Sequence, residues 1–246
     1  MSGAPDVDGE LPFLAHLIEL RERLLKAVVA VGVLFLAGIP FANRIYALLA
    51  QPLLDKMPAG TKMIAIEVAS PFLTPLKLTF FAALVIAMPV VLYQAWAFVA
   101  PGLYRHEKRL AVPLLVSAVA LFYTGCAFAY FLVLPAVFGF LQAVAPAGVA
   151  VMTDISQYLD FVLVLFLAFG LCFEVPVAVV ILVLLGWVTP AQLREARSYV
   201  IVGAFIIAAV LTPPDIVSQL LLAIPMCILY EIGILASRWL PARAEV

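Results

Sequence analysis

Charged residues are scarce in this chain of 246 residues. Asp, Glu, Lys and Arg make up 12% of it, whereas hydrophobic residues make up 66% and the mean hydropathy is +1.19. A soluble domain of this length carries about a quarter charged residues. Several apolar runs reach the roughly 20 residues that cross a bilayer core as a helix. The composition therefore predicts an integral membrane protein and argues against a large soluble helical core.

Cysteine, histidine and catalytic motifs are equally sparse. The three cysteines, Cys126, Cys172 and Cys227, lie inside apolar runs without CxxC spacing, which argues against a disulfide framework or a cysteine metal site. His16 and His106 lie outside the apolar runs. The runs therefore contain no histidine that could form an intramembrane Ser–His dyad or a zinc site. No GxxxxGK[ST], HExxH, GxSxG or GxGD stretch is present. We expect no catalytic residues, cofactor or metal, and the net charge of −1 predicts no nucleic-acid partner.

Six apolar runs are predicted to span the membrane as helices, because a backbone in lipid must satisfy its own hydrogen bonds. They cover residues 24–41, 78–100, 110–134, 159–188, 199–211 and 216–236. The fifth run is short for a core of about 30 Å, so the bilayer must thin there or neighbouring helices must shield it. Prolines interrupt other runs, at Pro89, Pro113, Pro176 and Pro225. The predicted fold is one all-α polytopic membrane domain over residues 1–246, a curved bundle with a concave face.

The distribution of Lys and Arg predicts the orientation. Ten of the 14 flank the start of the first run, the two connections at 101–109 and 189–198, or the end of the sixth run. The other four lie at positions 44–77 on the opposite side. The positive-inside rule then places both termini in the cytoplasm. Outer loops are expected at 42–74, 135–157 and 212–215, and Thr153 or Asp154 is a candidate cap for the fourth helix.

An amphipathic helix is predicted over residues 11–23, lying at the cytoplasmic surface and running into the first span. His16, Glu19, Arg23 and Lys26 follow helical spacing on one face. Glu19 and Arg23 are four residues apart, so they can form an ordinary intrahelical ion pair. Alternatively, the carboxylate is available to a ligand.

Two further acids lack an obvious explanation. Glu107 is the one acid in the basic connection PGLYRHEKR, where it either balances Lys108 or Arg109 or offers a carboxylate to a cationic ligand. Glu174 is the one charged residue between Phe161 and Val188. A charge at that depth costs at least about 2.5 kcal/mol on insertion scales. We expect Glu174 to face protein or a water-filled hollow, either as a protonated acid bonded to a neighbouring helix or as a functional group.

Five motifs in order resemble the TatC family, the multispanning receptors of the twin-arginine protein translocase. They are HLIELRERLL, ASPFLTPLKL, YQAWAFVA followed by PGLYRHEKR, FEVPV, and LTPPDIVSQLLLAIPM. The resemblance covers roughly residues 11–238, and six spans with both termini inside is that family's layout. It implies a protein of the bacterial cytoplasmic (inner) membrane that binds the twin-arginine signal peptides of folded cargo. It also implies TatB-like and TatA-like single-span partners, self-association, and transport driven by the protonmotive force.

The resemblance also implies roles for particular residues. Glu19 and Glu107 match the signal-binding glutamates and would pair with the two arginines of the signal, because a guanidinium fork suits a carboxylate. Arg21, Arg23, Phe98, Tyr104 and Arg105 would complete that surface. Glu174 matches the intramembrane glutamate that meets a partner helix or the inserted signal. Gln219 and Asp215 also match motif positions, although Asp215 can equally cap the sixth helix.

Two other functions are compatible with parts of the sequence. In a proton-coupled small-solute transporter, Glu174 and Asp215 would act as relay carboxylates. Such folds often carry paired broken helices in repeated halves, and the sequence shows no such pair. An intramembrane hydrolase would need a nucleophile and a base, which the apolar runs do not supply.

Overall fold

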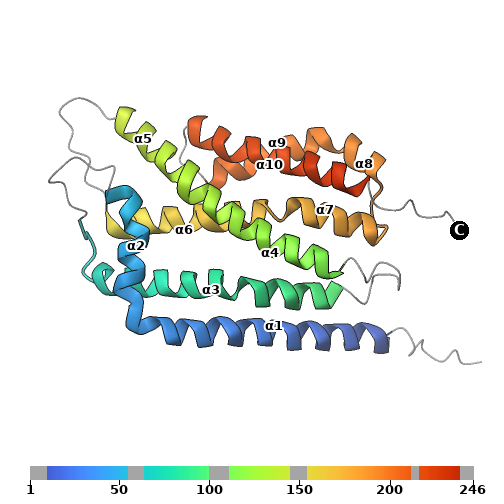
Figure 1. The fold of residues 1–246 in the computed structure, drawn as a ribbon, viewed down its shortest axis with the longest axis horizontal. Coiled ribbons are helices and arrows are strands. Elements are labelled where there is room, and N and C mark those ends of the chain that lie inside the picture. Colours follow the sequence, from blue (N-terminus) through green and yellow to red (C-terminus); the bar gives the residue numbers. More distant parts are fainter. Residues whose placement is uncertain (1–9, 55–63, 100–110, 145–153, 212–215, 239–246) are drawn as a thin grey trace, which may run out of the picture.

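The computed structural model of the chain describes residues 10–54, 64–99, 111–144, 154–211 and 216–238. Within these residues every regular element is a helix, and the one β contact is an isolated bridge between Ile64 and Asp154. Most of the helices run roughly along the long axis of the molecule, and α2 crosses them at one end (Figure 1). The all-α class expected from the apolar runs is therefore confirmed for the described part of the chain.

The N-terminal part consists of two long helices and a short crossing helix. Helix α1 (Glu10–Gly38) joins the predicted amphipathic segment and the first apolar run into one helix. A 3-10 turn (Ile39–Phe41) leads into α2 (Ala42–Leu54), and α3 (Ser70–Val99) packs along α1. Helix α2 lies inside the predicted outer loop 42–74, so the first part of that loop is helical.

The third apolar run continues well beyond its predicted end at residue 134. Helix α4 (Ala111–Phe128) passes through a π-helical turn (Ala129–Val133) into α5 (Leu134–Val144). Pro135 lacks an N–H, and the wider π turn just before it lets the helix continue past the proline. The first ten residues of the predicted outer loop 135–157 are thus part of a helix.

The fourth apolar run is broken in its middle, and the break is the main difference from the predicted span 159–188. Helix α6 (Ile155–Cys172) ends two residues before Glu174, and α7 (Val175–Leu184) begins directly after it. Pro176 has no N–H with which to continue the α6 hydrogen-bond ladder, which accounts for the break. The proline therefore divides the predicted span into two helices.

The C-terminal part begins where α7 ends in a tight turn. Gly186 has φ 72°, and the N–H of Trp187 donates to the carbonyl of Leu182, a pairing typical of a glycine-terminated helix. Helices α8 (Pro190–Glu195), α9 (Arg197–Leu211) and α10 (Ile216–Ser237) follow. Helix α10 packs against both α7 and α9.

Interhelical packing around α6 forms the main core. Phe122, Leu159, Leu165, Phe169 and Leu222 are fully buried there and come from α4, α6 and α10. Helices α4 and α6 approach so closely that a Cβ added to Gly125 would lie 2.5 Å from the carbonyl oxygen of Phe169. A larger residue at position 125 would force these two helices apart.

A hydroxyl from α4 satisfies a carbonyl that a proline leaves without a donor. Pro89 lies inside α3 and cannot donate to the carbonyl of Val85 one turn earlier. The hydroxyl of Tyr123 donates to that carbonyl at 3.0 Å. Helix α3 therefore stays continuous through Pro89 with its backbone satisfied, as a lipid environment requires.

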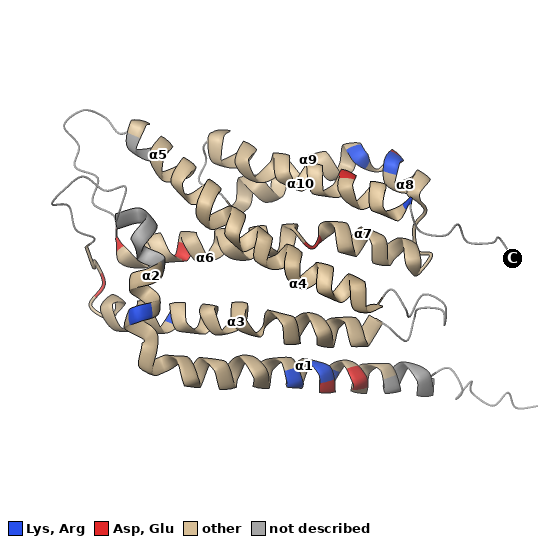
Figure 2. Cartoon of the chain, viewed as in Figure 1, with Lys and Arg blue, Asp and Glu red and all other residues tan. Residues whose placement is uncertain are grey.

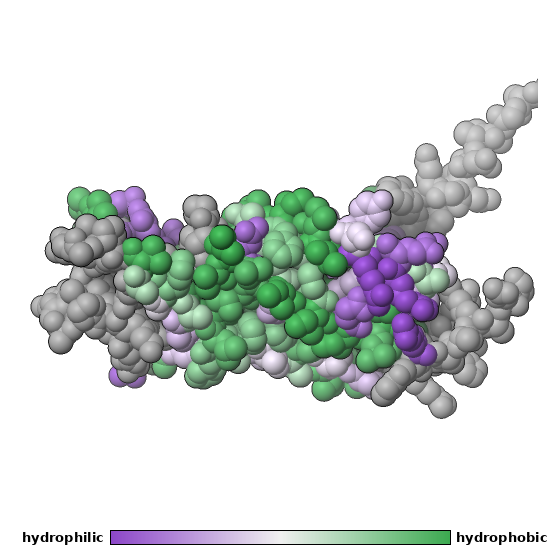
Figure 3. Space-filling view, turned by 90° about the horizontal axis from the view of Figure 1, so that it is seen from above, coloured by the Kyte–Doolittle hydropathy of each residue, from purple (hydrophilic) through white to green (hydrophobic). Residues whose placement is uncertain are grey.

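Five described helical segments are long and apolar enough to cross a membrane. They are His16–Leu48, Ser70–Val99, Ala111–Phe140, Ile155–Leu184 and Ile216–Ser237, and Arg197–Leu211 is a shorter apolar helix. On the face seen from above, hydrophobic residues cover the middle of the molecule, next to a hydrophilic patch at one end (Figure 3). Six crossings, the concave face and the cytoplasmic position of both termini stay predictions.

Candidate functional site

The first element of the candidate site is the polar face at the start of α1. The guanidinium of Arg23 donates to Glu19 Oε1, with Nε at 2.9 Å. His16 Nδ1 lies 3.9 Å from Glu19 Oε2 on the other side of the carboxylate. The ordinary intrahelical pair expected from the spacing is thus formed. The side chain of Glu19 nevertheless keeps 33% of its surface exposed, so water or a ligand can reach it.

Helix α3 supplies the second element, one residue before it ends at Val99. The ring of Phe98 stacks on the imidazole of His16, with centroids 4.2 Å apart and planes inclined by 17°. The contact joins the end of α3 to the start of α1. The structure thus brings Phe98 and Glu19, both proposed from the sequence as signal-binding residues, onto one surface through His16.

Arg21 does not share this surface. Residues two apart on a helix do not face each other, so Arg21 lies on a different side of α1 from Glu19. Its side chain is exposed, and no acidic partner lies within ion-pair distance among the described residues. Of the two arginines proposed from α1, the structure places only Arg23 against Glu19.

Three proposed residues of the connection between α3 and α4 lie outside the described residues: Tyr104, Arg105 and Glu107. The described ends of that connection are informative, however. Val99 and Ala111 both pack against one small apolar cluster that contains Trp96. Helix α3 therefore ends, and α4 begins, at the end of the molecule where His16 and Phe98 meet.

This end of the molecule carries most of the described basic residues. The starts of α1, α8 and α9 and the ends of α3 and α10 lie there (Figures 1 and 2). Six of the eight described Lys and Arg belong to those segments, and the other two are Arg44 and Lys77. The candidate site thus lies at the end where most described Lys and Arg gather, and Glu19 is an accessible acid among them.

Glu174 stands apart, at the break between α6 and α7. It precedes the first residue of α7, and its side chain makes no capping hydrogen bond. The carboxylate atom Oε1 is buried and has no hydrogen-bond partner in the described part of the chain. A bond from a neighbouring helix to Oε1, one of the two alternatives considered for this residue, is therefore absent there. The start of a helix carries a partial positive charge, which favours a carboxylate at this position.

The two remaining proposed residues belong to the last helical hairpin. Gln219 Nε2 donates to the carbonyl of Phe205 at 3.2 Å and so links α10 to α9. Asp215 lies outside the described residues, and its capping role stays a prediction. Gln219 and Glu174 belong to different helical segments, and no hydrogen bond joins their side chains.

One contact at the candidate site was not foreseen from the sequence, that of His16. His16 was placed on the polar face of α1 but not proposed as a site residue, although its spacing of three from Glu19 could have indicated it. At the opposite end, Asp154, one of the two residues proposed from the sequence as a cap, is the one that caps α6. Its carboxylate accepts hydrogen bonds from the N–H groups of Ile66, Ser156 and Gln157 at 3.0, 2.9 and 3.0 Å. These bonds, that of Ile66 foremost, lower the pKa of Asp154.

The chain resembles known proteins over almost its whole length. A family model described as Sec-independent protein translocase protein (TatC) matches residues 15–225. The chain is 58% identical to a Sec-independent protein translocase protein TatC of Azotobacter chroococcum, over 95% of this chain and 92% of that protein. It is 57% identical to the protein of the same description from Escherichia coli K12, over 95% and 90% respectively.

A solved structure agrees with the sequence relatives. The crystal structure described as Twin Arginine Translocase Receptor- TatC superposes with a TM-score of 0.81 at 38% identity, and the match covers 91% of this chain and 98% of that one. The similarity thus extends to the order and packing of the helices as well as to the motifs. The chain belongs to the TatC family of Sec-independent protein translocase proteins, a family of membrane proteins that act in protein transport.

Proposed function

We propose that this protein is the signal-peptide receptor of a twin-arginine translocase. Its ligand is the paired arginines of signal peptides on folded proteins, and its site is the basic end of the molecule. Because Lys and Arg favour the cytoplasmic side, this end faces the cytoplasm. Both termini then lie inside, in the bacterial inner membrane.

The observation that carries the proposal is the arrangement around Glu19. Its carboxylate is reachable by solvent, and its present partner Arg23 lies on the same helix at 2.9 Å. An exposed pair of this kind stabilises a helix by only about 0.2–0.5 kcal/mol. A hydrogen bond to a charged group in a less exposed site contributes about 1.5–3 kcal/mol. A guanidinium from a bound signal can therefore replace Arg23 at little cost.

The neighbouring aromatic contact supports the same assignment. His16 and Phe98 form a flat stacked pair beside the carboxylate. Arginine side chains stack on aromatic faces as well as pairing with acids, which lysine does poorly. Such a surface favours arginine over lysine in the ligand. Glu107, in the connection that starts directly after α3, supplies the second carboxylate, with Tyr104 and Arg105 near it.

Glu174 and Gln219 are assigned to partners within the membrane. The buried Oε1 of Glu174 lacks a partner in the described chain, and a buried unsatisfied polar atom is costly. A polar group on a TatA-like or TatB-like single-span helix, on another copy of this chain, or on the inserted signal would satisfy it. The short helix α9 would thin the bilayer beside that position. Transport is driven by the protonmotive force.

The test is charge reversal combined with site-specific photocross-linking. A photoreactive residue at position 98 should cross-link a twin-arginine peptide in the unmodified protein. We expect Glu19→Lys and Glu107→Lys each to abolish that cross-link, because each places a cation against the arginines. Glu67→Lys, an exposed acid at the opposite end, is the matched control and should leave the cross-link intact. Normal cross-linking in both reversed variants would refute the assignment.

A proton-coupled small-solute transporter remains the second candidate. It would use Glu174 as a relay carboxylate, and the break between α6 and α7 resembles the discontinuous helices of such folds. Those folds pair two broken helices in corresponding halves, whereas α3 and α10 run unbroken through Pro89 and Pro225. Solute uptake by reconstituted vesicles, abolished by Glu174→Gln, would favour this alternative.

A further inference from the structure

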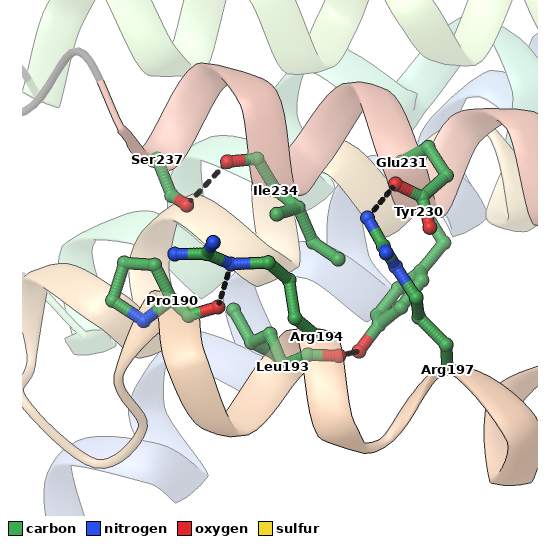
Figure 4. Close-up of polar contacts among 8 residues, drawn as sticks. All are labelled: Pro190, Leu193, Arg194, Arg197, Tyr230, Glu231, Ile234 and Ser237. Carbon is green, nitrogen blue, oxygen red and sulfur yellow. Dashed lines mark hydrogen bonds and ion pairs between the residues drawn. The ribbon is translucent and has the colours of Figure 1, made fainter.

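Helix α8 is fastened to α10 at the basic end of the molecule. Thr189 and Gln192 form a reciprocal capping box that starts α8. The hydroxyl of Tyr230 on α10 donates to the carbonyl of Leu193 at 2.7 Å, and this bond is buried (Figure 4). The short helix is thus held at a fixed place against the last turns of α10.

Three arginines surround this junction, and two of them lack an acidic partner in the described part of the chain. Arg197 Nη2 binds Glu231 Oε2 at 2.7 Å. Arg194 uses Nε to donate to the carbonyl of Pro190 at 3.2 Å, and its guanidinium extends toward the last turn of α10 at Ser237 (Figure 4). Arg238 follows that turn and is exposed.

The acids of the junction do not cancel this positive charge. Glu231 is already paired with Arg197, and Glu195 is exposed beside Arg194 without an ion pair among the described residues. Three cations therefore face two anions. The junction therefore carries an excess of positive charge at Arg194 and Arg238, which favours an anionic ligand.

An apolar groove lies along α10 and reaches Arg238. This open groove has a volume of about 500 Å³, and its lining includes Ile228, Ile232 and Leu235, with Glu231 among them and Arg238 at its C-terminal end. The three apolar side chains are each about half exposed. A groove of this composition suits a hydrocarbon chain and not a polar ligand.

Exposed aromatic residues mark the level of the membrane surface here. Trp187, just after α7, is 73% exposed, and Tyr199, in the first turn of α9, is 81% exposed. Tryptophan and tyrosine are enriched where the hydrocarbon core meets the headgroups. The unpaired arginines thus lie at headgroup depth and the groove extends into the acyl region.

We propose that the junction of α8 and α10 is a binding site for an anionic phospholipid. The lipid phosphate binds Arg194 and Arg238, and an acyl chain occupies the groove along α10. Basic pockets between membrane helices bind anionic headgroups in this way. A twin-arginine segment would be repelled by the same charges, so this site is separate from the one around Glu19 and does not depend on its function.

Native mass spectrometry of the purified chain with added dioleoylphosphatidylglycerol tests the proposal. We expect a retained one-to-one lipid adduct that phosphatidylcholine does not give. Arg194→Gln and Arg238→Gln should each reduce the adduct about fivefold, the factor that corresponds to about 1 kcal/mol per arginine near an anionic headgroup. Arg44→Gln, which removes an exposed arginine from α2 at the opposite end, is the matched control and should leave the adduct unchanged.

A second variant tests the groove separately from the charges. Ile232→Trp should fill it and reduce the adduct, whereas Ile86→Trp, on an exposed face of α3, should not. Inorganic phosphate at millimolar concentration should fail to displace the lipid. Undiminished adduct in the double arginine variant, displacement by phosphate alone, or indifference to Ile232→Trp would overturn the proposal.

Discussion

Asp154 and Glu174 each precede a helical half of the same apolar segment, yet their surroundings are opposite. Asp154 precedes α6, is buried, and accepts three backbone hydrogen bonds. Glu174 precedes α7 and has a buried carboxylate oxygen without a partner in the described chain. The carboxylate of Asp154 is hydrogen-bonded within the fold, whereas Oε1 of Glu174 is not.

The difference follows from the local backbone. Asp154 is extended, with φ −71° and ψ 135°, so its short side chain turns back onto the first N–H groups of α6. Glu174 is already helical, with φ −77° and ψ −13°, and the second residue of its helix is Pro176, which has no N–H. The carboxylate of Glu174 therefore makes no capping hydrogen bond to its own helix.

The comparison separates an acid whose carboxylate is bonded within the fold from acids whose carboxylates are not fully bonded there. Asp154 joins α6 to the segment before α3, since Ile66 donates to its carboxylate and Ile155 donates to the carbonyl of Ile64. Glu19 lies between the two extremes, with one exchangeable partner on its own helix. Polar groups in this protein that lack a firm internal partner are therefore the candidates for contacts with other molecules.

The largest expected effect is on transport, from Glu174→Ala. We expect export of a twin-arginine reporter to be lost, whereas signal-peptide cross-linking at position 98 remains. The melting temperature in detergent should stay the same or rise, because the substitution removes a buried unpartnered oxygen. Asp160→Ala is the control from the same segment: Asp160 is half exposed and pairs with Lys77, and export should persist. Export at the unmodified rate in Glu174→Ala would remove the functional distinction between the two acids.

The next effect is on stability, from Asp154→Asn. The lowered pKa of Asp154 means that the folded state favours its charged form, so its contribution is fully present above the unfolded value of about 3.9. That contribution is lost as the pH falls through the folded value. We expect the variant to melt several degrees below the unmodified protein at pH 7 and the gap to close below pH 4. A gap that does not depend on pH would show that the carboxylate charge is not what stabilises α6.

The smallest effect expected is from Tyr123→Phe, at a polar contact where the chain supplies its own partner. Removing the hydroxyl leaves the carbonyl of Val85 unsatisfied and should cost about 1 kcal/mol in the free energy of unfolding. Pro89→Ala restores the N–H that this carbonyl would meet in an ordinary helix. In that background Tyr123→Phe should cost much less, as a double-mutant cycle by denaturant titration would measure. Equal costs in both backgrounds would contradict the explanation.

Patterns within a few residues predicted much of the fold. The apolar runs indicated the helices, the spacing of Glu19 and Arg23 indicated their ion pair, and the polar residues before α6 included its cap. Helices α2 and α5 were missed because they lie almost wholly in segments 42–74 and 135–157, which were predicted as outer loops. At Pro135 a π turn accommodates the missing N–H, which the proline alone does not reveal.

The candidate site was predictable in part. The motifs indicated Glu19, Phe98 and Glu174 as residues of interest, but nothing in their spacing showed that His16 would link the first two. The arginine junction at α8 was read from the sequence only as a sign of orientation. Its bond from Tyr230 to Leu193 and its ion pair between Arg197 and Glu231 depend on how α10 packs against its neighbours.

Local sequence determined the helices, the break in the fourth segment and the helix caps. The reason is that a helical backbone hydrogen bond, or its loss at a proline, acts within about one turn. Contacts between distant segments were settled by packing, since their partners are dozens of residues apart. The bond from Ile66 to Asp154 spans 88 positions, and the stack of His16 on Phe98 joins α1 to α3. Side chains meet across such separations only when close approaches such as that of Gly125 to Phe169 have fixed the helices in place.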